Sequence, residues 1–244
     1  VSFSYPNGEE AVLKNIDFSC HKGQKIAVIG STGSGKSTLV KLMNRFYDVS
    51  RGSIEINGVD IRKYDLESLR AQIGYVAQKA HMFKGSIRSN ICFGKPEASE
   101  EEMVHASSVA QASDFISKRE NGYLDEIAED GTNISGGQKQ RLSIARVILK
   151  KPSLYIYDDS FSALDFKTDA TLRKALKPEV KDAIFFVVAQ RISTIMDSDM
   201  IIVLDEGQII GLGTHLELLK NCSVYQEIAH SQLTQKELDD YERN

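Results

Sequence analysis

The chain has 244 residues, of which 41% are hydrophobic and 26% charged, a composition typical of a folded globular domain and not of a disordered tail. The net charge of −4 gives no general attraction to a phosphate backbone, so we expect no nucleic acid among its partners. The three cysteines form no CxxC pair and the five histidines form no pair at i, i+4, which argues against a zinc or redox centre.

The amino-terminal part predicts antiparallel ribbon followed by a strand and a helix. Apolar and polar residues alternate over the first 25 or so residues and over 52–59, around the turn pairs Asn7-Gly8 and Asn57-Gly58. The apolar run 25–29 predicts a buried strand, and the apolar residues of 38–47 recur at helical spacing. The loop between them, which begins at Gly30, therefore joins a strand to a helix.

The remainder of the chain predicts a largely parallel sheet and an inserted group of helices. The runs 154–157, 183–189 and 200–204 are continuously apolar, and the helical stretch 169–176 lies between two of them, as in a sheet covered on both faces. Between residues 84 and 150 the pattern predicts helices with acidic first turns, such as Ser99-Glu-Glu-Glu102. The segment 235–244 is almost wholly polar and predicts a frayed helix or tail.

The loop after the first buried strand fits the phosphate-loop pattern. It reads Gly30-Ser-Thr-Gly-Ser-Gly-Lys-Ser37, and a preceding strand and a following helix are the context that the pattern requires. Glycines let backbone N–H groups converge on phosphate oxygens, Lys36 reaches the outer phosphates, and the Ser37 hydroxyl coordinates Mg²⁺. The alternative is a flexible turn. The residues expected to bind ATP are Ser31, Thr32, Gly33, Ser34, Gly35, Lys36, Ser37 and Thr38.

A carboxylate follows the apolar strand 154–157. Phosphate-loop proteins place such an acid, here Asp158, beside the metal, and ligands of open α/β sheets bind at the carboxyl ends of the strands. The alternative is an acid that caps the next segment. We expect an α/β fold of the P-loop NTPase (RecA-like) class within a single ATP-binding domain over 1–244. About 1–79 and 151–244 form a mostly parallel core with an antiparallel β subdomain, and about 80–150 form the inserted α-helical subdomain.

The segment Ile134-Ser-Gly-Gly-Gln138 precedes the helical run 142–149. Two glycines and a serine before a helix predict a second anion-binding helix start, although an ordinary turn is the alternative. At this segment the chain resembles the nucleotide-binding domain of ATP-binding cassette (ABC) transporters, whose signature usually reads LSGGQ. The resemblance covers essentially the whole chain. It implies that four residues act in trans on a partner's nucleotide: Ser135, Gly136, Gly137 and Gln138.

The resemblance implies further roles. Tyr5 stands where the family stacks an aromatic ring on adenine, although a lone Tyr in a strand more often only packs. Gln78 looks like the Q-loop glutamine that touches Mg²⁺, which makes the implied metal ligands Ser37, Gln78 and Asp158. Ser162-Ala-Leu-Asp165 matches the D-loop, so Ser162 and Asp165 are expected at a dimer interface. The stretch 81–90 is similar to the exporter class in particular.

Two positions depart from the pattern of family members that hydrolyse ATP well. Glu normally follows the strand-ending acid, and here Asp159 does; His normally ends a later strand, and here Gln190 does. Asp is one methylene shorter, which withdraws the carboxylate by roughly 1 Å, and Gln190 brings no positive charge to the transferring phosphoryl group. We expect ATP binding to survive and the ATPase activity of this site to be weak. The alternative is that both residues are tolerated variants in an ordinary hydrolysing domain.

This combination resembles the degenerate half of a bacterial heterodimeric multidrug exporter. The expected partners are a second, non-identical ATP-binding domain and a transmembrane domain outside this chain, which starts at Val1 and has no apolar run near the ~20 residues that span a bilayer. The expected location is the cytoplasmic face of the cell membrane, and the exported substrate is multidrug or lipid-like. The alternatives are a fully active ATPase domain of a homodimeric exporter and a non-transport ABC protein of DNA repair or translation.

Overall fold

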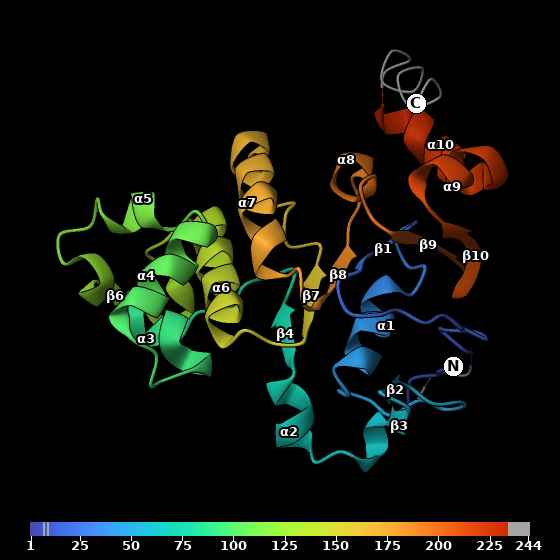
Figure 1. Cartoon of the computed structure of the whole chain (residues 1–244), viewed down its shortest axis with the longest axis horizontal. Coiled ribbons are helices and arrows are strands. Elements are labelled where there is room, and N and C mark those ends of the chain that lie inside the picture. Colours follow the sequence, from blue (N-terminus) through green and yellow to red (C-terminus); the bar gives the residue numbers. More distant parts are fainter. Residues whose placement is uncertain (7, 9, 234–244) are drawn as a thin grey trace. The chain divides into compact units, whose positions relative to one another are not determined.

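The computed structural model describes residues 1–6, 8 and 10–233, which form two compact units (Figure 1). The first unit comprises Val1–Gln72 and the chain from Ile184 onward, and the second comprises Ile73–Ala183. Asn7 of the predicted turn and the predicted tail over 235–244 lie outside the described residues. Among the described residues, no helix is long and apolar enough to cross a membrane.

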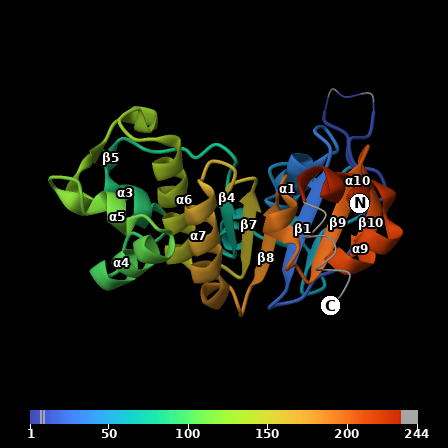
Figure 2. The same cartoon turned by 90° about the horizontal axis from the view of Figure 1, so that it is seen from above.

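A mostly parallel sheet carries the first unit. Its strands are β1 (Lys25–Gly30), β8 (Ile184–Val188), β9 (Met200–Asp205) and β10 (Gln208–Gly213), in the order β10-β9-β1-β8 (Figure 2). β1 runs parallel to both β8 and β9, and β10 pairs antiparallel with β9. Residues 26–29 are buried on both faces, which accounts for their continuous apolar pattern. The buried strands predicted within 25–29, 183–189 and 200–204 are confirmed.

Short helices complete the first unit. These elements are α1 (Lys36–Met43), η1 (Ile61–Lys63), α2 (Leu66–Ala71), α8 (Ile192–Ile195), α9 (His215–Asn221) and α10 (Ser223–Gln232). The predicted antiparallel ribbon is confirmed only in part. β2 (Glu55–Ile56) and β3 (Val59–Asp60) pair across the Asn57-Gly58 turn, whose φ values of 52° and 75° suit a tight hairpin. The first 25 residues otherwise contribute the isolated bridges Ser2–Arg51 and Phe3–Leu13.

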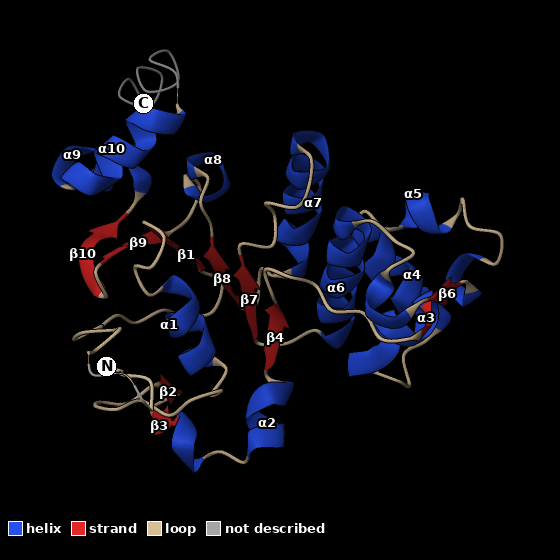
Figure 3. Cartoon of the chain, turned by 180° about the vertical axis from the view of Figure 1, so that it is seen from behind, coloured by secondary structure: helices blue, strands red, loops and turns tan. Residues whose placement is uncertain are grey.

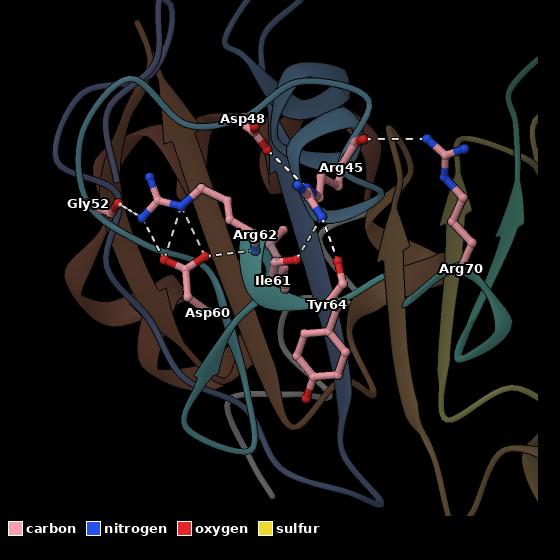
Figure 4. Close-up of polar contacts among 8 residues, drawn as sticks. All are labelled: Arg45, Asp48, Gly52, Asp60, Ile61, Arg62, Tyr64 and Arg70. Carbon is pink, nitrogen blue, oxygen red and sulfur yellow. Dashed lines mark hydrogen bonds and ion pairs between the residues drawn. The ribbon is translucent and has the colours of Figure 1, made fainter. Parts of the chain in front are cut away.

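The helix that follows the phosphate loop is shorter than predicted, because α1 ends at Met43 and not near residue 47. Arg45 has a left-handed φ of 49°, which breaks the helix. Its Nη1 donates to the carbonyl oxygens of Ile61 and Tyr64 at 3.1 and 2.9 Å, and its Nε donates to Asp48 at 3.1 Å (Figure 4). These tertiary hydrogen bonds stabilise a turn in a segment whose local pattern favours a helix.

The second unit joins a parallel strand pair to a group of helices (Figure 3). β4 (Ile73–Val76) runs parallel to β7 (Leu154–Asp158), and β5 (Gly85–Ser86) pairs antiparallel with β6 (Glu126–Ile127). Ser99 and Glu102 form a capping box at the acidic start of α4 (Glu100–Val109), where the first-turn acids predicted the start of a helix. The helices are α3 (Ile87–Ile91), η2 (Cys92–Gly94), α4 (Glu100–Val109), α5 (Ser113–Ile116), η3 (Gly122–Leu124), η4 (Glu129–Gly131), α6 (Gly136–Lys150) and α7 (Phe166–Glu179).

Candidate functional site

The glycine-rich loop joins β1 to α1 as predicted. The Lys36 ammonium group donates to the carbonyl oxygens of Gly30 at 2.8 Å and Ser31 at 2.6 Å, and to Ser34 Oγ at 3.3 Å. Gly35 is the N-cap of α1, and glycine has no side chain with which to cap this helix start. Its first-turn N–H groups and the Lys36 ammonium group are therefore the kind of donors that bind phosphate oxygens.

Two glycines of the loop are required by the backbone. Gly30 has a φ of 156°, and a Cβ there would lie 2.0 Å from the Leu204 carbonyl oxygen. Gly35 has a φ of 103°, and a Cβ there would lie 2.6 Å from Leu13 Cδ2. A larger residue at position 30 would collide with the main chain of β9, and one at position 35 would collide with the Leu13 side chain and adopt an unfavourable φ. The close approach of backbone that a phosphate cradle needs is thus built into the fold.

Tyr5 lies beside the helix that carries the loop. Its hydroxyl and Thr38 Oγ1 are 3.0 Å apart, and its ring meets those of Phe3 and Tyr47 edge-on at 4.9 and 5.2 Å between centroids. The Lys41 ammonium group is 5.8 Å from the ring centroid. The structure therefore brings Tyr5 together with Thr38 in the first turns of α1, 33 positions away in the sequence.

The segment after β8 holds the second non-consensus position, Gln190, which is exposed. Its main-chain carbonyl oxygen accepts a hydrogen bond of 2.8 Å from Nε2 of Gln232. The same side chain uses Oε1 to accept from the main-chain N–H of Ile192 at 2.8 Å. No sequence motif indicated Gln232, because this contact joins residues 40 or more positions apart.

In the second unit the acids at the end of β7 are both buried, Asp158 to 6% and Asp159 to 8% exposure. The Tyr75 hydroxyl donates to Asp158 Oδ2 at 3.4 Å. Burial raises the pKa of Tyr75 to about 12, and the negative charge of Asp158 and this hydrogen bond add to the shift. Tyr75 therefore stays a protonated donor to Asp158 at neutral pH.

Gln78 pairs with the second acid. Its Nε2 donates to Asp159 Oδ2 at 3.0 Å. The sequence predicts instead that Gln78 binds the metal together with the other acid, Asp158. Asp159 adopts a left-handed φ of 47°, a conformation that costs free energy in a residue other than glycine and that Asp tolerates better than most. Its carbonyl oxygen accepts from Ser162 Oγ at 2.7 Å, which holds the following loop in a tight turn.

The predicted signature forms the amino end of α6. Ser135 Oγ accepts from Gln138 N at 3.2 Å, and Gln138 Oε1 accepts from Ser135 N at 2.9 Å, which is a reciprocal capping box. Ser135 and Gly136 are exposed, so this helix start is accessible to an anion. One turn later, Gln140 Nε2 donates to the Ala77 carbonyl oxygen at 3.2 Å, which ties the helix to the segment carrying Gln78.

The predicted D-loop residue Asp165 is the N-cap of α7. It accepts from the Thr168 N–H at 2.9 Å and from the Thr168 hydroxyl at 2.7 Å, and these bonds lower the Asp165 pKa. Its position at an interface stays a prediction. The same holds for Mg²⁺: the described residues contain no group of three or more His, Cys, Asp or Glu that could hold a metal ion. Hydroxyl and carboxylate oxygens are nevertheless donors that Mg²⁺ prefers, and Ser37 and Asp158 each offer one of them.

Comparison with known proteins places the chain in a family. A family model described as "ABC transporter" matches residues 13–162. A putative multidrug export ATP-binding/permease protein of Bacillus subtilis is 45% identical over 93% of this chain and 39% of its own length. An uncharacterized ABC transporter ATP-binding protein of Mycobacterium tuberculosis is 43% identical over 95% of this chain and 40% of its own length. The chain thus spans about two fifths of the curated relatives it matches.

The fold is shared with a solved structure described as a bacterial Atm1-family ABC exporter with ATP bound. The TM-score is 0.93 at 37% sequence identity, over 96% of this chain and 41% of that one. This similarity confirms the P-loop NTPase class expected from the sequence.

Proposed function

This chain belongs to the ABC transporter family, and on that premise we propose that it is the ATP-binding domain of an exporter, with a site that holds ATP and hydrolyses it slowly. The observation that carries the proposal is the pair of departures at the catalytic positions, Asp159 and Gln190. The first of them is buried and already accepts a hydrogen bond from Gln78.

The phosphates, the metal ion and the adenine of ATP are each assigned to residues that the sequence motifs indicate. Lys36 and the backbone N–H groups of the loop hold the phosphates, and the exposed Ser37 hydroxyl with Asp158 and Gln78 holds Mg²⁺. An Mg²⁺ ion held by these residues would offset the negative charge of the outer phosphates. Tyr5 stacks on adenine, and its hydrogen bond to Thr38 supports this role because it fixes the ring beside the phosphate-binding helix.

Slow hydrolysis follows from the two non-consensus side chains. The Asp159 carboxylate is shorter than that of Glu, and one of its oxygens accepts from Gln78 at 3.0 Å, which leaves it poorly placed to orient an attacking water. Misplacement by about 1 Å costs on the order of 10²-fold in rate. Gln190 donates a neutral hydrogen bond and cannot offset the charge that develops on the phosphoryl group. ATP is therefore retained longer than in a domain with Glu and His at these positions.

The signature and the D-loop serve a partner's nucleotide. Ser135 is exposed at the start of α6. Residues 135–138 complete the active site of a second, non-identical ATP-binding domain. Ser162 and Asp165 lie in the loop that meets this partner. The chain thus contributes to hydrolysis chiefly at the other site.

A transmembrane domain is the second proposed partner. Matched relatives named ATP-binding/permease proteins are more than twice as long as this chain. The rings of Phe83 and Phe93 stack at 4.3 Å and are 46% and 59% exposed, with the Arg146 guanidinium against both. Such an exposed aromatic pair suits a docking surface for that domain, at the cytoplasmic face of the membrane. The substrate exported is of the multidrug or lipid-like class.

Rate comparisons test the proposal. The chain should hydrolyse ATP weakly alone, gain activity when mixed with a non-identical partner domain, and gain partially from Asp159→Glu combined with Gln190→His. Full activity of the unaltered chain as a homodimer, equal to that of the doubly substituted chain, would refute the slow site.

A further inference from the structure

The side chain of Gln232 makes two hydrogen bonds to the main chain around Gln190. Nε2 donates to the Gln190 carbonyl oxygen and Oε1 accepts from the Ile192 N–H, both at 2.8 Å. If the oxygen and nitrogen of the amide were exchanged, the NH₂ group would face the Ile192 N–H and the oxygen would face the Gln190 carbonyl oxygen. The pairing therefore requires a primary amide at residue 232 in this one orientation.

Gln232 accepts a hydrogen bond from the main chain at the start of α8. Ile192 is the first residue of this helix, and its N–H is one of the donors that a helix start leaves without an intrahelical partner. The N-cap residue, Arg191, makes no side-chain capping bond. The cap is supplied instead from α10, by a residue 40 positions later in the sequence.

The packing of α10 holds Gln232 in place. It is the last residue of α10, and Tyr225 and Ala229 on the same helix are fully buried. The Tyr225 hydroxyl lies 2.7 Å from Nδ1 of the buried His215, which ties α10 to α9. The far end of α8 is held separately, because Lys25 Nζ donates to the Thr194 carbonyl oxygen at 2.9 Å. The main chain from Gln190 to Thr194 is thus fixed at both ends.

We propose that Gln232 is a positioning residue, which fixes the main chain of residues 190–192 so that the Gln190 side chain faces the γ-phosphate of bound ATP. This inference rests on the proposed function of Gln190 as the residue that contacts that phosphate. ATP and ADP differ only by the γ-phosphate. Gln232 therefore governs the preference of the site for ATP over ADP and has no effect on the grip of the loop on the other phosphates.

The test is a set of equilibrium titrations of the chain with Mg²⁺–ATP and with Mg²⁺–ADP. Gln232→Leu removes both hydrogen bonds, and we expect it to weaken ATP binding about tenfold, the value of one hydrogen bond to a charged group, while ADP binding is unchanged. Gln226→Leu is the matched control, because Gln226 lies on the same helix and donates to the Leu219 carbonyl oxygen at 2.6 Å, away from residues 190–192. It should leave the ratio of the two affinities unchanged.

A double-substitution cycle identifies the route of the effect. If Gln232 acts through Gln190, then Gln232→Leu adds no further loss of ATP affinity in a chain that already carries Gln190→Ala. Gln232→Glu keeps the acceptor for the Ile192 N–H but faces the Gln190 carbonyl oxygen with a second acceptor, so it should lower ATP preference in a chain that folds normally. An unchanged ATP preference in both Gln232 variants, or full additivity in the cycle, overturns the inference.

The same data separate this inference from the proposed function. If Gln190→Ala lowers ATP affinity and the Gln232 variants do not, the positioning role is wrong and the role of Gln190 stands. If Gln190→Ala leaves the preference for ATP over ADP unchanged, the role of Gln190 fails and the positioning role fails with it.

Discussion

The assignment of the signature can be tested at Ser135, because the structure gives this residue a measurable structural role as well as the proposed one. Its hydroxyl caps α6 by accepting from Gln138 N at 3.2 Å. Ser99 caps α4 in the same way, accepting from Glu102 N at 3.1 Å, and both serines belong to capping boxes in the same unit of the protein. Replacing either serine with Ala should cost about 1 kcal/mol of unfolding free energy.

The two substitutions should differ in function. A hydroxyl that donates to a phosphate is worth about 1.5–3 kcal/mol, so Ser135→Ala should lower the ATPase rate of the mixed dimer by roughly 10- to 150-fold beyond the effect of Ser99→Ala. Ser135→Asp keeps a good N-cap and should preserve stability, yet it places a negative charge against the phosphates and should abolish the partner's activity. The assay is steady-state ATPase activity of the chain mixed with its partner domain, beside urea unfolding of each variant. Equal activity of Ser135→Ala and Ser99→Ala would refute the role in trans.

Two further predictions concern the fold. Arg45→Ala removes three hydrogen bonds of a charged donor, and the two to main-chain carbonyl groups alone should lower the unfolding free energy by about 3–6 kcal/mol. Arg45→Gly should recover about 1 kcal/mol of that loss, because glycine accepts the left-handed φ of 49°. A Gly variant that is less stable than the Ala variant in urea unfolding would contradict this. Burial lowers the pKa of the His215 imidazole below 6.5. The unfolded chain therefore binds a proton at this ring more readily than the folded chain does. The stability that the neutral ring contributes is fully present above pH 6.5 and is lost as the pH falls below that value. Urea unfolding between pH 7 and 5 should show a steeper fall for the unaltered chain than for His215→Gln, by at most about 1.4 kcal/mol per pH unit, and parallel curves would contradict the assignment.

The buried strands could be predicted because a single local property marks them. Residues 26–29 are apolar without interruption, and all four are buried within the strand Lys25–Gly30. The end of α1 could not be predicted, because the helical pattern continues past Arg45 and the turn depends on carbonyl groups 16 and 19 residues away. The strand β10 was missed because Gly211 and Gly213 interrupt its apolar residues.

The candidate site, too, has some parts that the sequence predicts and others that it does not. The loop from Gly30 to Ser37 is recognisable because phosphate binding imposes glycines at fixed spacing, and the serine and two glycines of 135–137 predicted the start of a helix there. The bond between Gln78 and Asp159 depends on the parallel pairing of β4 with β7, which the local sequence does not specify. No local sequence pattern indicates Gln232, because only the folded chain brings α10 to the segment after β8.

Retention of ATP at this chain's own site can be measured on the dimer itself. The most direct measurement is the chemical state of the nucleotides retained by the dimer of this chain and its partner, isolated rapidly after several turnovers with Mg²⁺–ATP and then quenched in acid. We expect intact ATP at the site formed by this chain's phosphate loop and ADP at the partner's loop. The retained ATP should be lost when Asp159→Glu and Gln190→His are introduced together. ADP at both sites of the unaltered dimer would contradict this expectation.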